Sequence, residues 1–247
     1  MLRLFLLTTD TPCDKNDSVV VFIFERSIPV PKVSEEYLED KRNEILDAAF
    51  EVCKRKPAYE VTMSDIVAET GMSQGGVYKY FNNIYLVYAA LIDRANLVGN
   101  QIGKIDEVML LELKPEEKLE KLFKVSESFL SDMLLSYNKI LFELSTYCIQ
   151  NPEIDKKING ETKATPVFPY LAGRAAELII TQVQTGYFKP VIPVTDILSF
   201  MVSSFDGIIR DVTLNKCYNI KSDAMSDLDE KKLISSLYLS ILKLLGM

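Results

Sequence analysis

The stretch that decides the fold is "TMSDIVAETGMSQGGVYKYFNN", which runs from Thr62 to Asn83. Thr62 and Asp65 have the spacing of a capping box that opens a helix. Gly71 can supply the left-handed residue that ends this helix, and Ser73 is suited to cap a second, shorter one. Two short helices joined by a tight glycine turn predict a helix-turn-helix.

Gly75 and Gly76 fall in the first turn of the second helix, where an interior glycine costs about 1 kcal/mol relative to alanine. In a helix-turn-helix the second helix lies in the major groove of DNA, with its N-terminal residues nearest the base edges. Because glycine has no Cβ, the backbone can approach the DNA surface closely, which would offset this cost. A flexible loop without a partner is the alternative explanation of the two glycines.

The residues around the glycines favour DNA as the partner. From Met72 to Tyr88 the only charged side chain is that of Lys79, although the whole chain carries a net charge of −7. Carboxylates would be repelled by phosphates, and this stretch has none. Tyr78 and Tyr80 can donate their hydroxyls to phosphate oxygens, or they pack into the core with solvated hydroxyls.

The segments "RNEILDAAFEV" (42–52) and "YEVTMSDIVAETGMSQGGVYKYF" (59–81) resemble the N-terminal DNA-binding domain of the TetR/AcrR family of bacterial transcriptional regulators. The resemblance covers about residues 41–95. It implies DNA contacts for Thr62, Ser73, Gln74, Gly75, Gly76, Tyr78, Lys79 and Tyr80. Gln74 is the best candidate for reading a base, because its amide can form two hydrogen bonds with an adenine edge. Arg42 is either a further contact to the DNA backbone or a solvated surface residue.

One position departs from the family pattern. A lysine is common three residues after the phenylalanine of the Y-x-Y-F motif, and this chain has Ile84 there. Residues 34–94 also contain seven cationic side chains against eleven carboxylates, a net charge of −4. Since each neutralised phosphate adds to the salt-dependent part of the affinity, we expect weak non-specific binding and a shallow salt dependence.

Apolar periodicity after residue 33 predicts an all-α chain. We expect an N-terminal three-helix helix-turn-helix DNA-binding domain at 34–95 and a C-terminal helical ligand-binding and dimerisation domain at 96–247. A helix from Asn83 to about Gly103 is predicted to join the two domains and to transmit the effect of a ligand. Further helices are expected at roughly 115–135, 138–150, 168–186, 194–215 and 228–245.

Residues 1–33 form an atypical N-terminal extension. The run "VVVFIF" (19–24) is typical of a β-strand, and "IPVPK" is typical of an extended linker. The abrupt change after this segment favours a native start near Val30, with a disordered tail or an extra strand as the alternatives. The intact mass of the protein expressed from its native gene decides between them.

The resemblance also implies a ligand pocket enclosed by helices between about residues 105 and 186. The aromatic and soft side chains available for it are Phe129, Met133, Tyr137, Phe142, Tyr147, Phe168 and Tyr170. Glu143 or Glu177 could supply a polar group. The alternative is that these side chains form ordinary core.

The last two predicted helices have strong apolar stripes, which suit a four-helix bundle between two subunits. The predicted interface residues are Met201, Phe205, Ile208, Leu237, Ile241 and Leu245. The alternative is that both stripes pack within their own domain.

The chain contains no histidine, and its four cysteines are far apart. This removes the usual general base and zinc ligand, so we expect no catalytic residue, no metal and no cofactor. No apolar run reaches the roughly 18 residues of a membrane span, and we expect a cytoplasmic protein without a membrane partner. The function that results is a dimeric repressor, released from a palindromic double-stranded DNA operator by an unknown small-molecule effector. A ligand-independent architectural or activating DNA binder, and an enzyme or lipid carrier with a vestigial helix-turn-helix, are the alternatives.

Overall fold

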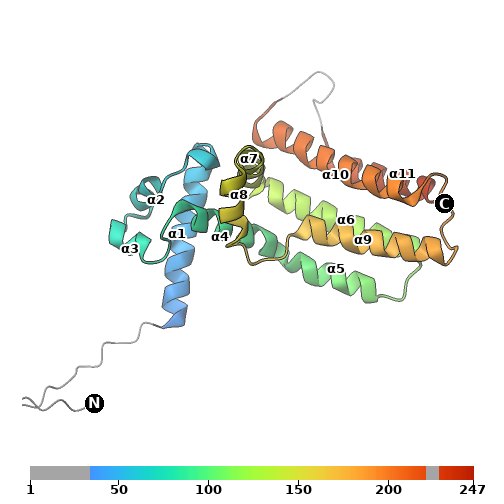
Figure 1. Cartoon of the computed structure of the whole chain (residues 1–247), viewed down its shortest axis with the longest axis horizontal. Coiled ribbons are helices and arrows are strands. Elements are labelled where there is room, and N and C mark those ends of the chain that lie inside the picture. Colours follow the sequence, from blue (N-terminus) through green and yellow to red (C-terminus); the bar gives the residue numbers. More distant parts are fainter. Residues whose placement is uncertain (1–33, 221–227) are drawn as a thin grey trace, which may run out of the picture.

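The computed structural model describes residues 34–220 and 228–247, and this part of the chain is helical without a strand. The all-α prediction is confirmed; the N-terminal extension, with its predicted β run, lies outside the described residues. The helices are α1 (Glu35–Arg55), η1 (Ala58–Glu60), α2 (Met63–Thr70), α3 (Gln74–Tyr78), α4 (Ile84–Leu97), η2 (Val98–Asn100), α5 (Gln101–Leu110), α6 (Pro115–Leu134), α7 (Asn138–Gln150), α8 (Pro152–Asn159), α9 (Val167–Gln184), α10 (Val194–Cys217) and α11 (Glu230–Leu244). Figure 1 shows α1–α4 at one end of the molecule and the C-terminus at the other.

The ends of the two helices of the helix-turn-helix follow their sequence signals. Thr62 and Asp65 form both halves of the capping box at the start of α2, and Gly71 ends this helix in the left-handed region, with φ 65°. Ser73 Oγ accepts a hydrogen bond from the N–H of Gly76 at 3.1 Å and so caps α3. Local sequence therefore determines where the recognition element begins and ends.

The core beneath the helix-turn-helix reaches beyond the four N-terminal helices. Its buried side chains from α1–α4 include Ile45, Ala49, Cys53, Ile66, Val77, Phe81 and Leu91. Ile140 and Leu144 of α7 and Ile158 of α8 are buried in the same cluster. Figure 1 shows α7 and α8 between the N-terminal helices and the rest of the molecule. These two helices therefore complete the N-terminal domain, although they follow it by more than 40 residues in the chain.

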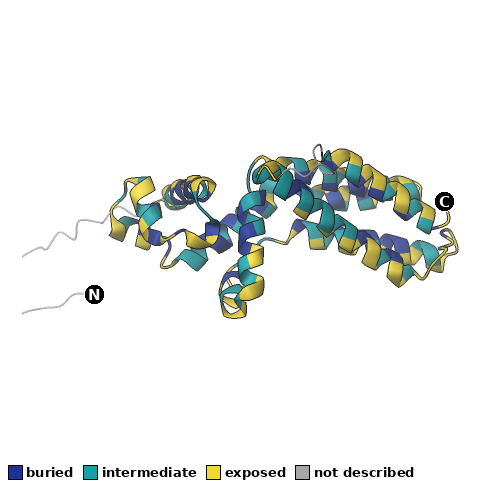
Figure 2. Cartoon of the chain, turned by 90° about the horizontal axis from the view of Figure 1, so that it is seen from above, coloured by how far each residue is buried: buried dark blue, intermediate teal, exposed yellow. Residues whose placement is uncertain are grey.

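Helices α5, α6, α9, α10 and α11 form a second bundle around their own core. Leu122, Phe129, Leu130, Ile179, Ile197, Ile234 and Ile241 are among its buried residues. The loop after α9 is tied to the end of α11, because the N–H of Lys189 donates to the carbonyl of Leu245 at 3.0 Å. Figure 2 shows that buried residues follow the sides of the helices that face one another, whereas the outer faces are exposed.

The predicted single helix from Asn83 to about Gly103 is wrong. Asn83 caps α4 as expected, but α4 ends at Leu97 and α5 begins at Gln101. Between them Gly99 has φ 68° and Asn100 has φ 48°, and both lie in the left-handed region. Glycine adopts this conformation without strain and asparagine tolerates it, so the chain can turn there.

In the described ranges, none of the helices combines the length and the apolar character needed to cross a membrane. Cys53, Cys148 and Cys217 are free thiols. Burial raises the pKa of Cys53 to about 12. This thiol is therefore protonated at neutral pH and serves as a packing residue.

Candidate nucleic-acid interface

Helix α3 presents most of its predicted reading residues to solvent. Ser73, Gln74, Gly75, Tyr78 and Lys79 are exposed, whereas Gly76 and Tyr80 are half-buried. Figure 1 shows α3 at the end of the molecule farthest from the C-terminus, where a duplex could reach it.

Buried residues in α3 and directly after it anchor the exposed face of this helix to the core. Val77 and Phe81 are fully buried in the core below α3. Arg42 of α1 lies over Phe81, with the guanidinium carbon 4.5 Å from the ring centroid. It also donates a hydrogen bond to the carbonyl of Tyr80 at 3.2 Å. Arg42 thus braces α1 against the end of α3, a role that sequence reasoning had not considered for it.

Lys79 and Thr62, two of the predicted DNA contacts, differ in whether their polar groups are already bound within the protein. Lys79 forms no ion pair within the described residues, and its ammonium lies 5.7 Å from the ring centroid of Tyr80. The Thr62 hydroxyl instead donates to Asp65 at 2.7 Å, inside the cap of α2. Hydrogen bonds from Lys56 and Thr62 lower the pKa of Asp65 to about 2. Lys79 can therefore reach a phosphate without breaking an ion pair, while the hydroxyl of Thr62 is already occupied.

The two glycines of α3 have different surroundings. A Cβ built on Gly76 would lie 3.2 Å from Ser73 Oγ and 3.4 Å from the end of Met72, so the cap itself explains why a small residue is present. A Cβ built on Gly75 meets no atom within 4 Å. The packing of the free protein gives no reason for a glycine at position 75.

The structure does not bring the seven predicted pocket residues together. Phe129 and Phe168 pack in the bundle core with ring centroids 5.0 Å apart, and Met133 is buried beside them. Tyr170 donates a hydrogen bond to Asp106. Tyr137 packs against Phe50 of α1, with the ring centroids 4.9 Å apart.

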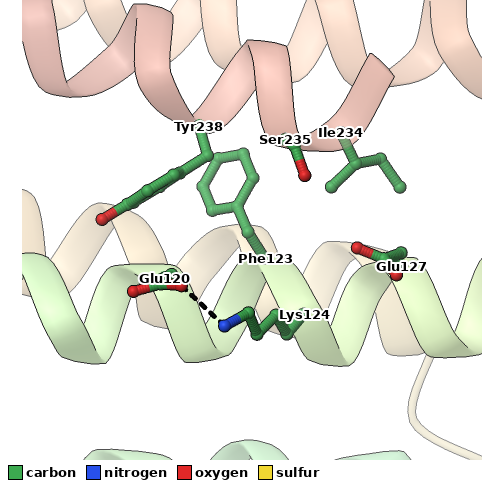
Figure 3. Close-up of a pocket in the computed structure, with 7 residues that line it drawn as sticks. All are labelled: Glu120, Phe123, Lys124, Glu127, Ile234, Ser235 and Tyr238. Atoms are coloured by element: carbon green, nitrogen blue, oxygen red, sulfur yellow. Dashed lines mark hydrogen bonds and ion pairs between the residues drawn. The ribbon is translucent and has the colours of Figure 1, made fainter. Parts of the chain in front are cut away.

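Phe142 and Tyr147 line a separate cavity of about 520 Å³, together with Pro57, Tyr59, Glu143, Thr146, Gln150, Leu214 and Tyr218. We call it the junction cavity, because it lies where η1, α7 and the end of α10 meet. A second hollow, between α6 and α11, has a volume of only about 50 Å³ and is crossed by the rings of Phe123 and Tyr238 (Figure 3). It has room for a few water molecules at most.

Glu143, one of the two predicted polar groups, connects the N-terminal domain to the end of α10. Its carboxylate accepts hydrogen bonds from the N–H of Ala58 at 2.7 Å and the hydroxyl of Tyr218 at 2.6 Å, and it pairs with Lys139 at 2.9 Å. Lys139 in turn donates to the carbonyl of Cys53, near the end of α1, at 2.8 Å. Periodicity could not have revealed this network, because its members come from three distant segments, at residues 53–58, 139–143 and 218.

Glu177, the other predicted polar group, pairs with Arg174 at 2.7 Å, and both side chains lie on the same helix, α9. Its side chain is 59% exposed. Glu177 is therefore a surface residue and lines neither cavity.

Four of the six predicted dimer residues require a correction, because they are buried within their own chain. Met201, Leu237, Ile241 and Leu245 are at most 5% exposed, and Phe205 and Ile208 are half-buried. These stripes pack α10 and α11 into the bundle of their own chain, so the four buried side chains have no surface left for a partner. The exposed apolar residues of the same two helices are Phe200, Val202 and Leu239.

Comparisons with known proteins agree with this geometry. Residues 45–91 match the sequence model of the family described as bacterial regulatory proteins, tetR family. The chain is 28% identical over 181 residues to an uncharacterized HTH-type transcriptional regulator, YfiR, of Bacillus subtilis (strain 168), a match that covers 73% of this chain and 84% of that protein.

Two solved structures share the fold. One is the fatty acid degradation regulator FadR from Bacillus halodurans, with a TM-score of 0.58 and 22% identity over 82% of this chain and 94% of that one. The other is a TetR transcription regulator from Haloarcula marismortui, with a TM-score of 0.56 and 15% identity over 84% of this chain and 97% of that one. The family match, the curated relative and the common fold lead to one conclusion: this chain is a DNA-binding transcriptional regulator whose residues 45–91 match the tetR family of bacterial regulatory proteins.

Proposed function

We propose that this regulator is a dimeric repressor, which leaves a palindromic operator when a small ligand binds. In this proposal the exposed face of α3 enters the major groove. Gln74, in the first turn, hydrogen-bonds an adenine edge, while Lys79 and the hydroxyls of Tyr78 and Tyr80 hold phosphates. Two such faces, related by a two-fold axis, read the two halves of the operator.

The observation that carries the proposal is the open space at Gly75. An alanine there would meet no atom within 4 Å, and it would stabilise the helix by up to about 1 kcal/mol. Gly173 of α9 is equally open, but Gly75 lies in the exposed first turn of α3, beside Gln74, where a helix-turn-helix is expected to meet a partner. A DNA surface that approaches the bare backbone is such a partner.

The test compares Gly75→Ala with Gly173→Ala. Gly173 lies in α9 and also has no atom within 4 Å of a built Cβ, so it is a matched control. Both substitutions are expected to raise the free energy of unfolding by up to about 1 kcal/mol. Only Gly75→Ala is expected to weaken operator binding, by tenfold or more, measured by fluorescence anisotropy on a labelled duplex.

The operator for this measurement comes from selection of random duplexes by the wild-type chain at moderate salt. We expect a palindromic sequence whose half-sites are separated by about one helical turn or a multiple of it. If no sequence is enriched, or if Gly75→Ala binds the operator as tightly as Gly173→Ala, α3 is not the reading helix.

The proposed dimer uses the outer faces of α10 and α11. Leu239 of α11 is 60% exposed, and Phe200 and Val202, which project from opposite sides of α10, are each 44% exposed. Ser235, Ser236 and Ser240 lie on the exposed side of α11, and side chains of this size permit close approach of two helices. Apolar and small residues on otherwise polar faces support a second copy of this chain as the partner.

A further inference from the structure

The junction cavity has the size of a site for a small molecule. Its volume of about 520 Å³ falls within the range of roughly 300–1,000 Å³ that is usual for such sites. The walls come from η1 of the DNA-binding domain, from α7, and from the C-terminal end of α10. A molecule in this cavity would therefore touch both parts of the protein at once.

Aromatic rings dominate the walls. Tyr59 of η1 and Tyr147 of α7 are stacked, with ring centroids 5.5 Å apart and planes inclined by 21°. On α7 and at the end of α10, Phe142 meets Tyr218 edge-on at 6.1 Å. Tyr59 is 44% exposed, so the stack is accessible from solvent. Parallel aromatic faces of this kind match a flat ring system that slips between them or replaces one of them.

The polar groups of the cavity exclude negative charge. Glu143 is its one carboxylate, and no lysine or arginine is found among its described lining residues. The carboxylate is buried and is held by Ala58, Tyr218 and Lys139, while the Lys139 ammonium also donates to a carbonyl at the end of α1. Burial and the hydrogen bond to Glu143 raise the pKa of Tyr218, which keeps its phenol neutral. An anionic ligand would meet this carboxylate without a free cation, whereas ring faces favour neutral or cationic compounds.

We propose that the junction cavity is the effector site, and that its ligand is a planar aromatic compound without negative charge, bound between Tyr59 and Tyr147. This inference rests on the proposed ligand-responsive repressor and names the site and the class of ligand. It places the effector outside the bundle core, on the side of α7 that faces η1.

The position of the cavity explains how a ligand would act on DNA binding. η1 connects α1 to α2, and its Ala58 is held by Glu143 of α7 and by the hydroxyl of Tyr88 of α4, at 2.5 Å from the Ala58 carbonyl. A ring that separates Tyr59 from Tyr147 moves η1 relative to α7 and turns the helix-turn-helix against the bundle. Because only differential affinity shifts the equilibrium, the ligand must bind the turned form more tightly than the operator-bound form.

The first experiment measures direct binding of three tricyclic probes to the full chain by isothermal titration calorimetry without DNA. The probes are phenazine, which is neutral, proflavine, which is cationic, and anthracene-2-carboxylate, which is anionic. We expect the first two to bind at least tenfold more tightly than the third. Equal or tighter binding of the anionic probe would overturn the proposed ligand class.

Variants then locate the site. Tyr59→Ala removes half of the stack and Thr146→Trp fills the cavity from its rim, and each is expected to weaken phenazine binding at least tenfold. Tyr37→Ala is the matched control, because Tyr37 is 49% exposed and lies outside the cavity. Thr146→Trp keeps the aromatic walls, so it separates loss of the site from loss of the fold. Unchanged phenazine affinity in both cavity variants overturns the proposal.

The last measurement adds phenazine to the complex of the chain with its selected operator. We expect at least a tenfold loss of operator affinity in the wild type and in Tyr37→Ala, and none in Thr146→Trp. Phenazine that binds in the cavity without changing operator affinity would overturn the effector role. A chain that selects no operator but binds phenazine through Tyr59 would refute the repressor function and leave the binding site standing.

Discussion

Gln101 is a buried amide at the start of α5. It is 0% exposed, and neither polar atom of its side-chain amide has a hydrogen-bond partner within the described chain. A buried polar group without a partner costs about 1–3 kcal/mol of desolvation. The residue lies directly after the left-handed pair Gly99–Asn100, so the turn that separates α4 from α5 pushes a polar side chain into the apolar interior.

Gln101→Met is therefore expected to stabilise the protein by about 1–3 kcal/mol, because the thioether fills a similar volume and leaves no amide unpaired. Urea unfolding followed by circular dichroism measures the change. Gln184→Met on the exposed end of α9 is the control and should have little effect. Loss of stability in Gln101→Met would mean that the amide has a partner, such as a buried water molecule.

At the scale of elements, the start of α2 depends on one carboxylate. Asp65 accepts hydrogen bonds from the N–H and the hydroxyl of Thr62, and from Lys56 at 2.8 Å. The bond from Lys56 is the largest cause of the fall of its pKa from 3.8 to about 2. Since the pKa is lower in the folded state, the carboxylate contributes stability above about pH 3.8, and this contribution is lost as the pH falls through about 2.

Asp65→Asn is expected to lower the free energy of unfolding by about 1 kcal/mol at pH 7, the usual cost of losing a cap. The value stays modest because the side chain is 34% exposed and the ion pair is screened by solvent. Urea titrations between pH 7 and pH 2 should show the wild type approaching the variant as the solution becomes acidic. Asp40→Asn, on the exposed side of α1, is the control; a difference that keeps its full pH 7 size at pH 2 would contradict the role of the charge.

Sequence signals predicted the elements of the helix-turn-helix well because caps are local. The caps formed by Ser73, Thr62 and Gly71 each involve only residues within four positions in the chain. A short stretch of sequence therefore contains every residue that such a cap needs. The turn at Gly99 was missed, because apolar spacing continues from Val98 through the break and masks it. Periodicity records which side chains are apolar and does not test whether the backbone between them is helical.

At the scale of the whole molecule, sequence could not separate the inner faces of α10 and α11 from the outer ones. Both helices have a strong apolar stripe, and the stripe that suited a dimer turned out to fill the bundle of its own chain. Leu239 lies outside that stripe, and apolar spacing therefore did not place it among the predicted interface residues. Which surface remains free is decided by the packing of all helices together, and a pattern within one helix does not contain this information.

Leu239→Glu is expected to raise the dissociation constant of the proposed dimer at least 100-fold, because a carboxylate would be buried between the two subunits in place of an apolar side chain. Sedimentation velocity over a range of protein concentrations measures the effect. Leu110→Glu is the matched control, since Leu110 is 83% exposed at the end of α5, against 60% for Leu239. Identical sedimentation of the two variants would exclude this face of α11 as the interface.

The side chains that α7 and α8 place beneath the helix-turn-helix make the N-terminal domain (α1–α4) dependent on the rest of the chain. Ile140, Leu144 and Ile158 are at most 2% exposed, and a fragment that stops at residue 97 would lose all three from its interior. At about 1.5–3 kcal/mol for each buried aliphatic group, that loss is comparable to the entire stability of a small domain. A chimaera that joins the DNA-binding domain of another protein to this chain would thus also need that protein's residues at the buried positions of α7 and α8.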